Sequence, residues 1–145
     1  MQHRLNALLN YYTTGNNSPT DHQFLNLING DLNTPLTVVN FFKFRKVADA
    51  SLINDEPMTG FDAFTKYAET SVPKVAKVGG RFLLRGSVEG SLIGNDTPKW
   101  DIIAIGEYPK RECFIHLLED AEYRTAFQYR QAAIAVQNVF LVNPV

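Results

Sequence analysis

The feature that most constrains the fold is the order of the segments that follow residue 35. Four stretches rich in β-branched and aromatic residues are typical of strands, and two regions with apolar residues at helical spacing separate them. Strands are predicted at 36–44, 81–88, 100–108 and 136–142, and helical regions at about 60–78 and about 109–134. The order strand-helix-strand-strand-helix-strand predicts an α+β domain with an antiparallel sheet and ferredoxin-like topology.

The connection between the second and third strands contains no helical pattern. Its glycines, Gly86, Gly90 and Gly94, are typical of turns. The two strands are therefore predicted to form a hairpin. Such glycines also allow a β-bulge in this hairpin. In the first long helix, Pro73 removes a backbone donor, which predicts a kink or a restart there.

Neither face of the predicted sheet is clearly polar. Apolar and polar residues alternate in a sheet with one solvated face, but Val38-Val39, Phe41-Phe42 and residues 102–105 do not alternate. Both faces are therefore predicted to be buried. The N-terminal helices could cover part of the second face, and the sheet of a twofold partner could cover the rest, so we predict a homodimer.

Residues 1–34 are predicted to form an N-terminal helical extension ahead of a domain at residues 35–145. A first helix is indicated by an apolar stripe at i, i+3, i+4 and i+7, formed by Leu5, Leu8, Leu9 and Tyr12. Residues 15–18 interrupt this pattern. Thr20 and Gln23 have the spacing of a capping box, which predicts a second helix that ends at Gly30.

Charge and cysteine content exclude several classes of protein. The net charge is −1 with acidic and basic residues mixed, so neither nucleic acid nor a membrane is a predicted partner. The single cysteine, Cys113, is typical of a reducing compartment. Because no signal-peptide pattern and no apolar run of about 18 residues is present, a cytoplasmic location is predicted. His3, His22 and His116 lack metal-ligand spacing, so no metal and no cofactor are predicted.

A few polar residues are predicted to point into the core. Tyr123, Phe127 and Arg130 share one helix face, Asn40 interrupts an apolar strand, and Tyr67 lies on the inner face of the first long helix. Because both helical regions cover the same side of the sheet in this topology, these groups are predicted to converge on one pocket. A buried arginine needs a partner, and its fork of donors fits a carboxylate or a similar anion.

Two interpretations of this cluster stay open. Arg130 could anchor a ligand, or it could be a structural residue that pairs with Glu107 or Glu122. Arg81 and Trp100 are further candidate ligand-binding residues, and no catalytic residue is assigned. A tyrosine acting as a base would need a lowered pKa, whereas a tyrosine that donates a hydrogen bond to a developing oxyanion needs none.

Several short strings match a known family in order and spacing. They are Val38-Val-Asn-Phe-Phe-Lys-Phe44, Lys77-Val-Gly-Gly-Arg81, Arg85-Gly86, Trp100-Asp-Ile-Ile-Ala-Ile-Gly-Glu-Tyr-Pro109, Glu122-Tyr123 and Tyr129-Arg-Gln-Ala-Ala133. From about residue 36 to 142, the chain resembles the family of domain of unknown function 1330 (DUF1330), within the dimeric α/β-barrel superfamily. The resemblance implies a ferredoxin-like subunit whose sheet packs against that of a twofold mate. It implies a fold rather than a reaction, because the family has no settled activity.

Relatives in the wider superfamily include cofactor-free monooxygenases, haem-degrading enzymes, lactone isomerases and stress-induced proteins. Together with the predicted pocket, the resemblance indicates a small-molecule-binding protein. If the protein is an enzyme, the expected activity is that of a cofactor-independent oxygenase or isomerase that acts on a small aromatic or carboxylate metabolite. The alternative is a non-catalytic binding or stress-response protein with a purely structural polar core. A haem-handling barrel would need an axial ligand, and His116 is predicted to point away from the apolar stripe. Longer relatives often carry a histidine where this chain has Tyr129, which argues against a mechanism that needs an imidazole there.

Overall fold

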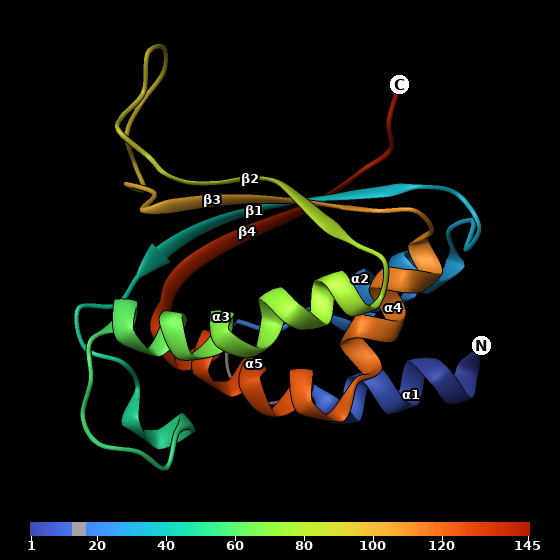
Figure 1. The fold of residues 1–145 in the computed structure, drawn as a ribbon, viewed down its shortest axis with the longest axis horizontal. Coiled ribbons are helices and arrows are strands. Elements are labelled where there is room, and N and C mark those ends of the chain that lie inside the picture. Colours follow the sequence, from blue (N-terminus) through green and yellow to red (C-terminus); the bar gives the residue numbers. More distant parts are fainter. Residues whose placement is uncertain (13–16) are drawn as a thin grey trace.

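A computed structural model describes residues 1–12 and 17–145 of the chain. It consists of a four-stranded sheet with helices on one side (Figure 1). The elements are α1 (Gln2–Tyr11), α2 (Asp21–Asn29), β1 (Leu36–Phe44), the short 3-10 helix η1 (Ala50–Leu52), α3 (Gly60–Lys77), β2 (Arg81–Ser87), β3 (Ile102–Tyr108), α4 (Arg111–Glu119), α5 (Ala121–Ala133) and β4 (Ile134–Val142). The second helical region is divided at Asp120, whose side chain caps α5.

The sheet has the strand order of a ferredoxin-like fold. Its strands are antiparallel throughout, in the order β2-β3-β1-β4, so β2 and β4 are the edge strands. The helices lie against one face, and the other face is open in the single chain (Figure 1). The α+β fold, its antiparallel sheet and the helices that precede it are therefore confirmed.

Strand β1 shows why the predicted strands do not alternate. Leu36, Val38 and Phe42 face the helices and are at most 3% exposed, whereas Val39 and Phe41 face the open side. The strand register places further apolar side chains on the open face, namely Ile103, Ile105, Leu84 and Phe140. Since both faces carry apolar residues, the open face is an apolar surface that the single chain leaves uncovered.

The N-terminal helices lie in the helix layer and not on the open face of the sheet. Tyr12 donates a hydrogen bond to the Leu118 carbonyl at 2.6 Å. Arg4 joins α1 to α4 through ion pairs to Glu112 at 2.8 Å and Glu119 at 2.7 Å. The expectation that these helices help to cover the second face of the sheet is wrong, because their apolar side chains pack against α4 and α5.

Local signals near the N-terminus and in α3 had different outcomes. The side chain of Thr20 accepts from the Gln23 N–H at 3.2 Å and the side chain of Gln23 accepts from the Thr20 N–H at 2.9 Å, so the capping box is confirmed. The predicted interruption at residues 15 and 16 lies outside the described residues, and the division of the chain after residue 34 stays a prediction.

Helix α3 continues through Pro73, so a restart does not occur there. No helix within residues 1–12 or 17–145 is long and apolar enough to cross a membrane.

A β-bulge in β2 changes which of its residues face the helices. Phe82 and Arg85 pair with β3 residues that face the helices, and Leu84 pairs with one that faces the open side. Leu83 is the additional residue between them. Simple alternation from Phe82 would place Arg85 on the open face, but the bulge turns its side chain toward the helices.

The first residue of α3 leaves no space for a side chain. A Cβ at Gly60 would collide with the backbone carbonyl oxygens of Arg45 and Ala133, the latter at 2.8 Å. Gly60→Ala is therefore expected to lower the free energy of unfolding by about 2 kcal/mol. Chemical denaturation would measure this loss. Gly90→Ala is the matched control, since a Cβ there meets nothing within 4 Å, and equal stability of the two variants would contradict the packing described here.

Candidate functional site

A large cavity lies between the helices and the inner face of the sheet. Its volume is about 950 Å³, within the range of about 300–1,000 Å³ that is common for ligand pockets. The walls are mainly apolar and aromatic, and include Val38, Phe42, Phe64, Phe82, Ala104, Leu117 and Phe127. Exposed residues of both edge strands, Arg85 on β2 and Val139 on β4, also line the cavity. The cavity therefore reaches the surface at both edges of the sheet.

Arg130 lies in the wall of this cavity, on the last turn of α5, and is 8% exposed. Its Nε and Nη2 atoms donate to Oε1 of Gln137 at 3.1 and 2.8 Å. Nη1 donates to the Tyr67 hydroxyl at 3.2 Å, and Nη2 donates to Oδ1 of Asn40 at 3.4 Å. All of these acceptors are neutral.

The carboxylates considered as structural partners of Arg130 bind other cations. Glu107 pairs with Arg81 at 2.7 Å, and Glu122 pairs with Lys74 at 3.3 Å. Within the described part of the chain, no carboxylate forms an ion pair with Arg130. The guanidinium is therefore a buried cation without a charged partner. Such an arrangement is rare in proteins, because burying an unpaired charge costs free energy.

Aromatic rings compensate part of this charge. The guanidinium carbon of Arg130 lies 4.7 Å from the ring centroid of Phe42, 5.1 Å from that of Phe127 and 5.6 Å from that of Tyr67. A desolvated cation over an aromatic face gains about 2 kcal/mol or more from such a contact. The rings orient the guanidinium but do not neutralise it, so an anion that enters the cavity would be attracted to it.

Two tyrosine hydroxyls lie beside the guanidinium. The hydroxyl oxygens of Tyr67 and Tyr123 are 2.8 Å apart, and both side chains are buried. The pair has two protons but needs only one for its mutual hydrogen bond, so one O–H donor remains. Burial raises the pKa of Tyr123 well above its usual value of 10. Tyr123 is therefore protonated at neutral pH, which favours a role as a hydrogen-bond donor over a role as a base.

Asn40 and Gln137 position the guanidinium from two neighbouring strands. The Nδ2 atom of Asn40 donates to the Ala104 carbonyl at 3.0 Å, which directs Oδ1 toward Arg130. Gln137 lies on β4, beside Phe42 of β1. It is absent from the predicted site residues, although the signal that identifies Asn40, a polar residue within an apolar strand, applies equally to Gln137.

Two of the predicted site residues lie outside the cavity. Arg81 faces the open side of the sheet, and its side chain is 72% exposed beside Glu107. Trp100 packs against Phe41 of the open face, with ring centroids 5.6 Å apart. The cavity brings together the other four candidates, Asn40, Tyr67, Tyr123 and Arg130.

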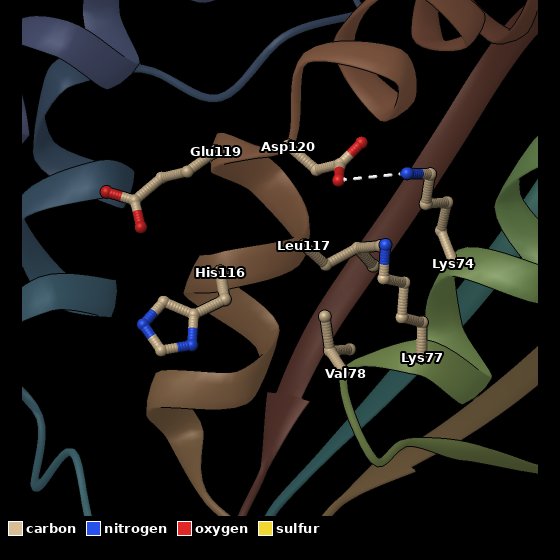
Figure 2. Close-up of a pocket in the computed structure, with 7 residues that line it drawn as sticks. All are labelled: Lys74, Lys77, Val78, His116, Leu117, Glu119 and Asp120. Carbon is tan, nitrogen blue, oxygen red and sulfur yellow. Dashed lines mark hydrogen bonds and ion pairs between the residues drawn. The ribbon is translucent and has the colours of Figure 1, made fainter.

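A smaller hollow of about 500 Å³ lies between α3 and α4 (Figure 2). In it, Lys74 pairs with Asp120 at 3.1 Å. His116 lines this hollow and not the large cavity, and it pairs with Glu112 at 3.0 Å with its side chain 56% exposed. The paired charges are typical of a solvated surface. No group of three or more His, Cys, Asp or Glu side chains in the described ranges could hold a metal ion.

The family of the chain follows from its match to a known domain. The family model described as "Domain of unknown function (DUF1330)" matches residues 32–145. The chain belongs to the DUF1330 family. The RPA0582 protein of Rhodopseudomonas palustris, a protein of unknown function, has a similar crystal structure with 30% sequence identity and a TM-score of 0.80, covering 91% of this chain and 98% of that one. A structure of methylated RPA0582 has 30% identity and a TM-score of 0.82, covering 91% and 96%. No curated protein matches.

The N-terminal extension contributes to the cavity of this DUF1330 protein. Tyr12, Phe24 and Leu27 precede the residues that match the family model, yet they line the cavity and are at most 4% exposed. The candidate site is therefore built by the family domain together with the helices that precede it.

Proposed function

We propose that this protein binds a small organic anion in the large cavity, with the charged group at Arg130 and an apolar or aromatic body against the surrounding rings. The observation that carries the proposal is the buried guanidinium of Arg130, whose hydrogen-bond acceptors are all neutral. A carboxylate could accept from the remaining tyrosine O–H and displace the side chain of Gln137 from the guanidinium. The alternative of a purely structural polar core is less well supported, because such a core would be filled and its arginine paired with an acid.

Thermal unfolding with simple probes tests this proposal. Octanoate and phenylacetate are expected to raise the melting temperature by about 5 °C at saturating concentration. Octanol and phenylacetamide have the same apolar bodies without the charge, and we expect them to give a much smaller increase. Equal shifts for the charged and neutral probes, or no shift with any of them, would contradict binding of an anion at Arg130.

The affinity for a carboxylate is expected to depend on pH in one direction only. Arginine remains protonated throughout the accessible range, and the raised pKa of Tyr123 keeps that hydroxyl protonated at neutral and mildly alkaline pH. Affinity for octanoate should therefore be constant from about pH 6 to about pH 9 and fall below about pH 4.5, where the probe itself takes up a proton. Calorimetric titration would measure this, and a loss of affinity between pH 7 and pH 9 would show that an essential donor ionises there.

The arrangement of donors favours a second candidate function, cofactor-independent oxygenation or isomerisation of an acidic aromatic or carboxylate substrate. The hydroxyls of Tyr67 and Tyr123 lie beside the guanidinium of Arg130, and such a group of neighbouring donors is suited to stabilising an enolate or phenolate. The described residues that line the cavity include no His, Asp or Glu that could remove a proton. Such a reaction would therefore need a substrate that is itself acidic. Oxygen consumption by the protein in the presence of a dihydroxybenzoate would support this function, and binding without turnover would favour the non-catalytic alternative.

The open face of the sheet supports a homodimer. Val39, Phe41 and Phe140 belong to an apolar surface that the chain does not cover, and burying it against a second copy would remove it from water. Light scattering at micromolar concentration is expected to give twice the chain mass of 16.3 kDa. A mass of one chain would contradict the dimer.

The free thiol of Cys113 is consistent with our prediction of a cytoplasmic location.

A further inference from the structure

We infer that the ligand carries a second anionic group, which Arg85 holds at the edge of the sheet while Arg130 holds the first. The inference rests on the proposed function and names the class of ligand. It is a small molecule with an anionic oxygen group at each end, for which an α,ω-dicarboxylate is the simplest form. Arg85 would thus be a residue that determines specificity.

The charge of the cavity supports two anionic groups rather than one. Among the described residues that line it, the only charged side chains are Arg85 and Arg130, and no Asp, Glu, Lys or His is present. No carboxylate of the described residues forms an ion pair with Arg85. The cavity therefore carries two positive charges and no negative charge. A ligand with a single negative charge would neutralise only one of these two positive charges.

The bulge in β2 places Arg85 on the cavity side of the sheet. Because Leu83 is an additional residue, Arg85 is opposite Ala104 and faces the helices together with Phe82. The guanidinium carbon of Arg85 lies 5.1 Å from the centroid of the Phe82 ring, which also lines the cavity. Bulges often redirect a side chain near a functional site. Here the effect is to bring a second guanidinium to the cavity.

The spacing of the strands between Asn40 and Arg85 sets the expected length of the ligand. Asn40 on β1, Ala104 on β3 and Arg85 on β2 are neighbours across the sheet and face the same side. Two strand spacings separate the backbones of Asn40 and Arg85 by about 10 Å, and the guanidinium of Arg130 donates to the side chain of Asn40. Between them lies the small side chain of Ala104, which leaves room for a chain of methylene groups or a ring. The ligand is therefore expected to span a distance on the order of 10 Å between its binding partners.

Calorimetric titration of the intact protein with two series of probes tests this inference. The first series is the linear dicarboxylates from succinate to sebacate, and the second is the monocarboxylates of the same chain lengths. We expect one length of dicarboxylate to bind about two- to fivefold more tightly than its monocarboxylate, the range for a partly exposed ion pair. Arg85→Ala should remove this advantage, so that dicarboxylates and monocarboxylates of the same chain length bind with similar affinity.

Arg81→Ala is the matched control. Arg81 lies on the same strand but on the open face, where it pairs with Glu107, so this variant should keep the advantage of the dicarboxylate. The inference is wrong if dicarboxylates bind no more tightly than monocarboxylates, if their advantage survives Arg85→Ala, or if Arg81→Ala removes it equally. Failure of every carboxylate to bind would overturn the proposed function as well, which distinguishes the two failures.

Discussion

Arg130→Met is expected to weaken carboxylate binding about 100-fold and to leave the free energy of unfolding within about 1 kcal/mol of the wild type. The affinity falls because a charged donor is lost from the end of the cavity. The loss of stability is small because methionine keeps much of the length and the contact with Phe42, and because a buried charge without a carboxylate partner is removed. The acceptors that Arg130 leaves line the cavity, which reaches the surface, so water can hydrogen-bond to them. Titration with octanoate and chemical denaturation measure the two effects separately.

The same pair of measurements on Arg124→Met provides the control. Arg124 lies on the same helix as Arg130, but its guanidinium carbon is 3.7 Å from the ring centroid of Tyr11 and it does not line the cavity. This variant should bind octanoate as the wild type does. If Arg130→Met instead lowers the free energy of unfolding by more than about 3 kcal/mol, Arg130 has the structural role of a buried polar core.

Phe140→Asp is expected to separate the proposed homodimer into single chains, with at least an approximately 100-fold increase in the dissociation constant. Phe140 is 52% exposed on the open face of the sheet, and its ring packs edge-on against Phe41 with centroids 5.9 Å apart. A carboxylate at this position would be buried without a partner in the dimer, but would remain solvated in the single chain. Sedimentation at a series of concentrations would measure the change in the dissociation constant.

Val47→Asp is the control for the dimer. Val47 is 64% exposed, lies outside the four strands of the sheet, and forms an isolated bridge with Thr59, the residue before α3. The same charge at this position should leave the dimer intact. A dimer that persists in Phe140→Asp would mean that a different surface of the chain forms the interface.

Much of the fold could be predicted because local sequence patterns identify its strands and helices. Strand β1 is recognised by its β-branched and aromatic residues, and α2 by the capping box at Thr20 and Gln23. The order of the elements then selects the topology, and the topology places two helical regions on one face of the sheet. That is why Tyr67 and Arg130, far apart in the sequence, could be expected to meet, as they do at 3.2 Å.

The remaining features depend on tertiary details that local patterns do not contain. The apolar stripe of α1 indicates that the helix packs somewhere, but not that it packs on α4 and α5 instead of on the open face. Arg81 and Trp100 share strands or strand ends with inward-facing residues, and only the register shows that they belong to the outer face. Arg85 illustrates the limit most clearly, because one additional residue in β2 reverses the side of the sheet to which it points.

A crystal structure of the intact protein with octanoate would test the central claim most directly. The account predicts the carboxylate within about 2.7–2.9 Å of a guanidinium nitrogen of Arg130, with the alkyl chain between the sheet and the helices. It would be contradicted by octanoate bound elsewhere on the protein, or by a cavity that remains without octanoate at a saturating concentration of the probe.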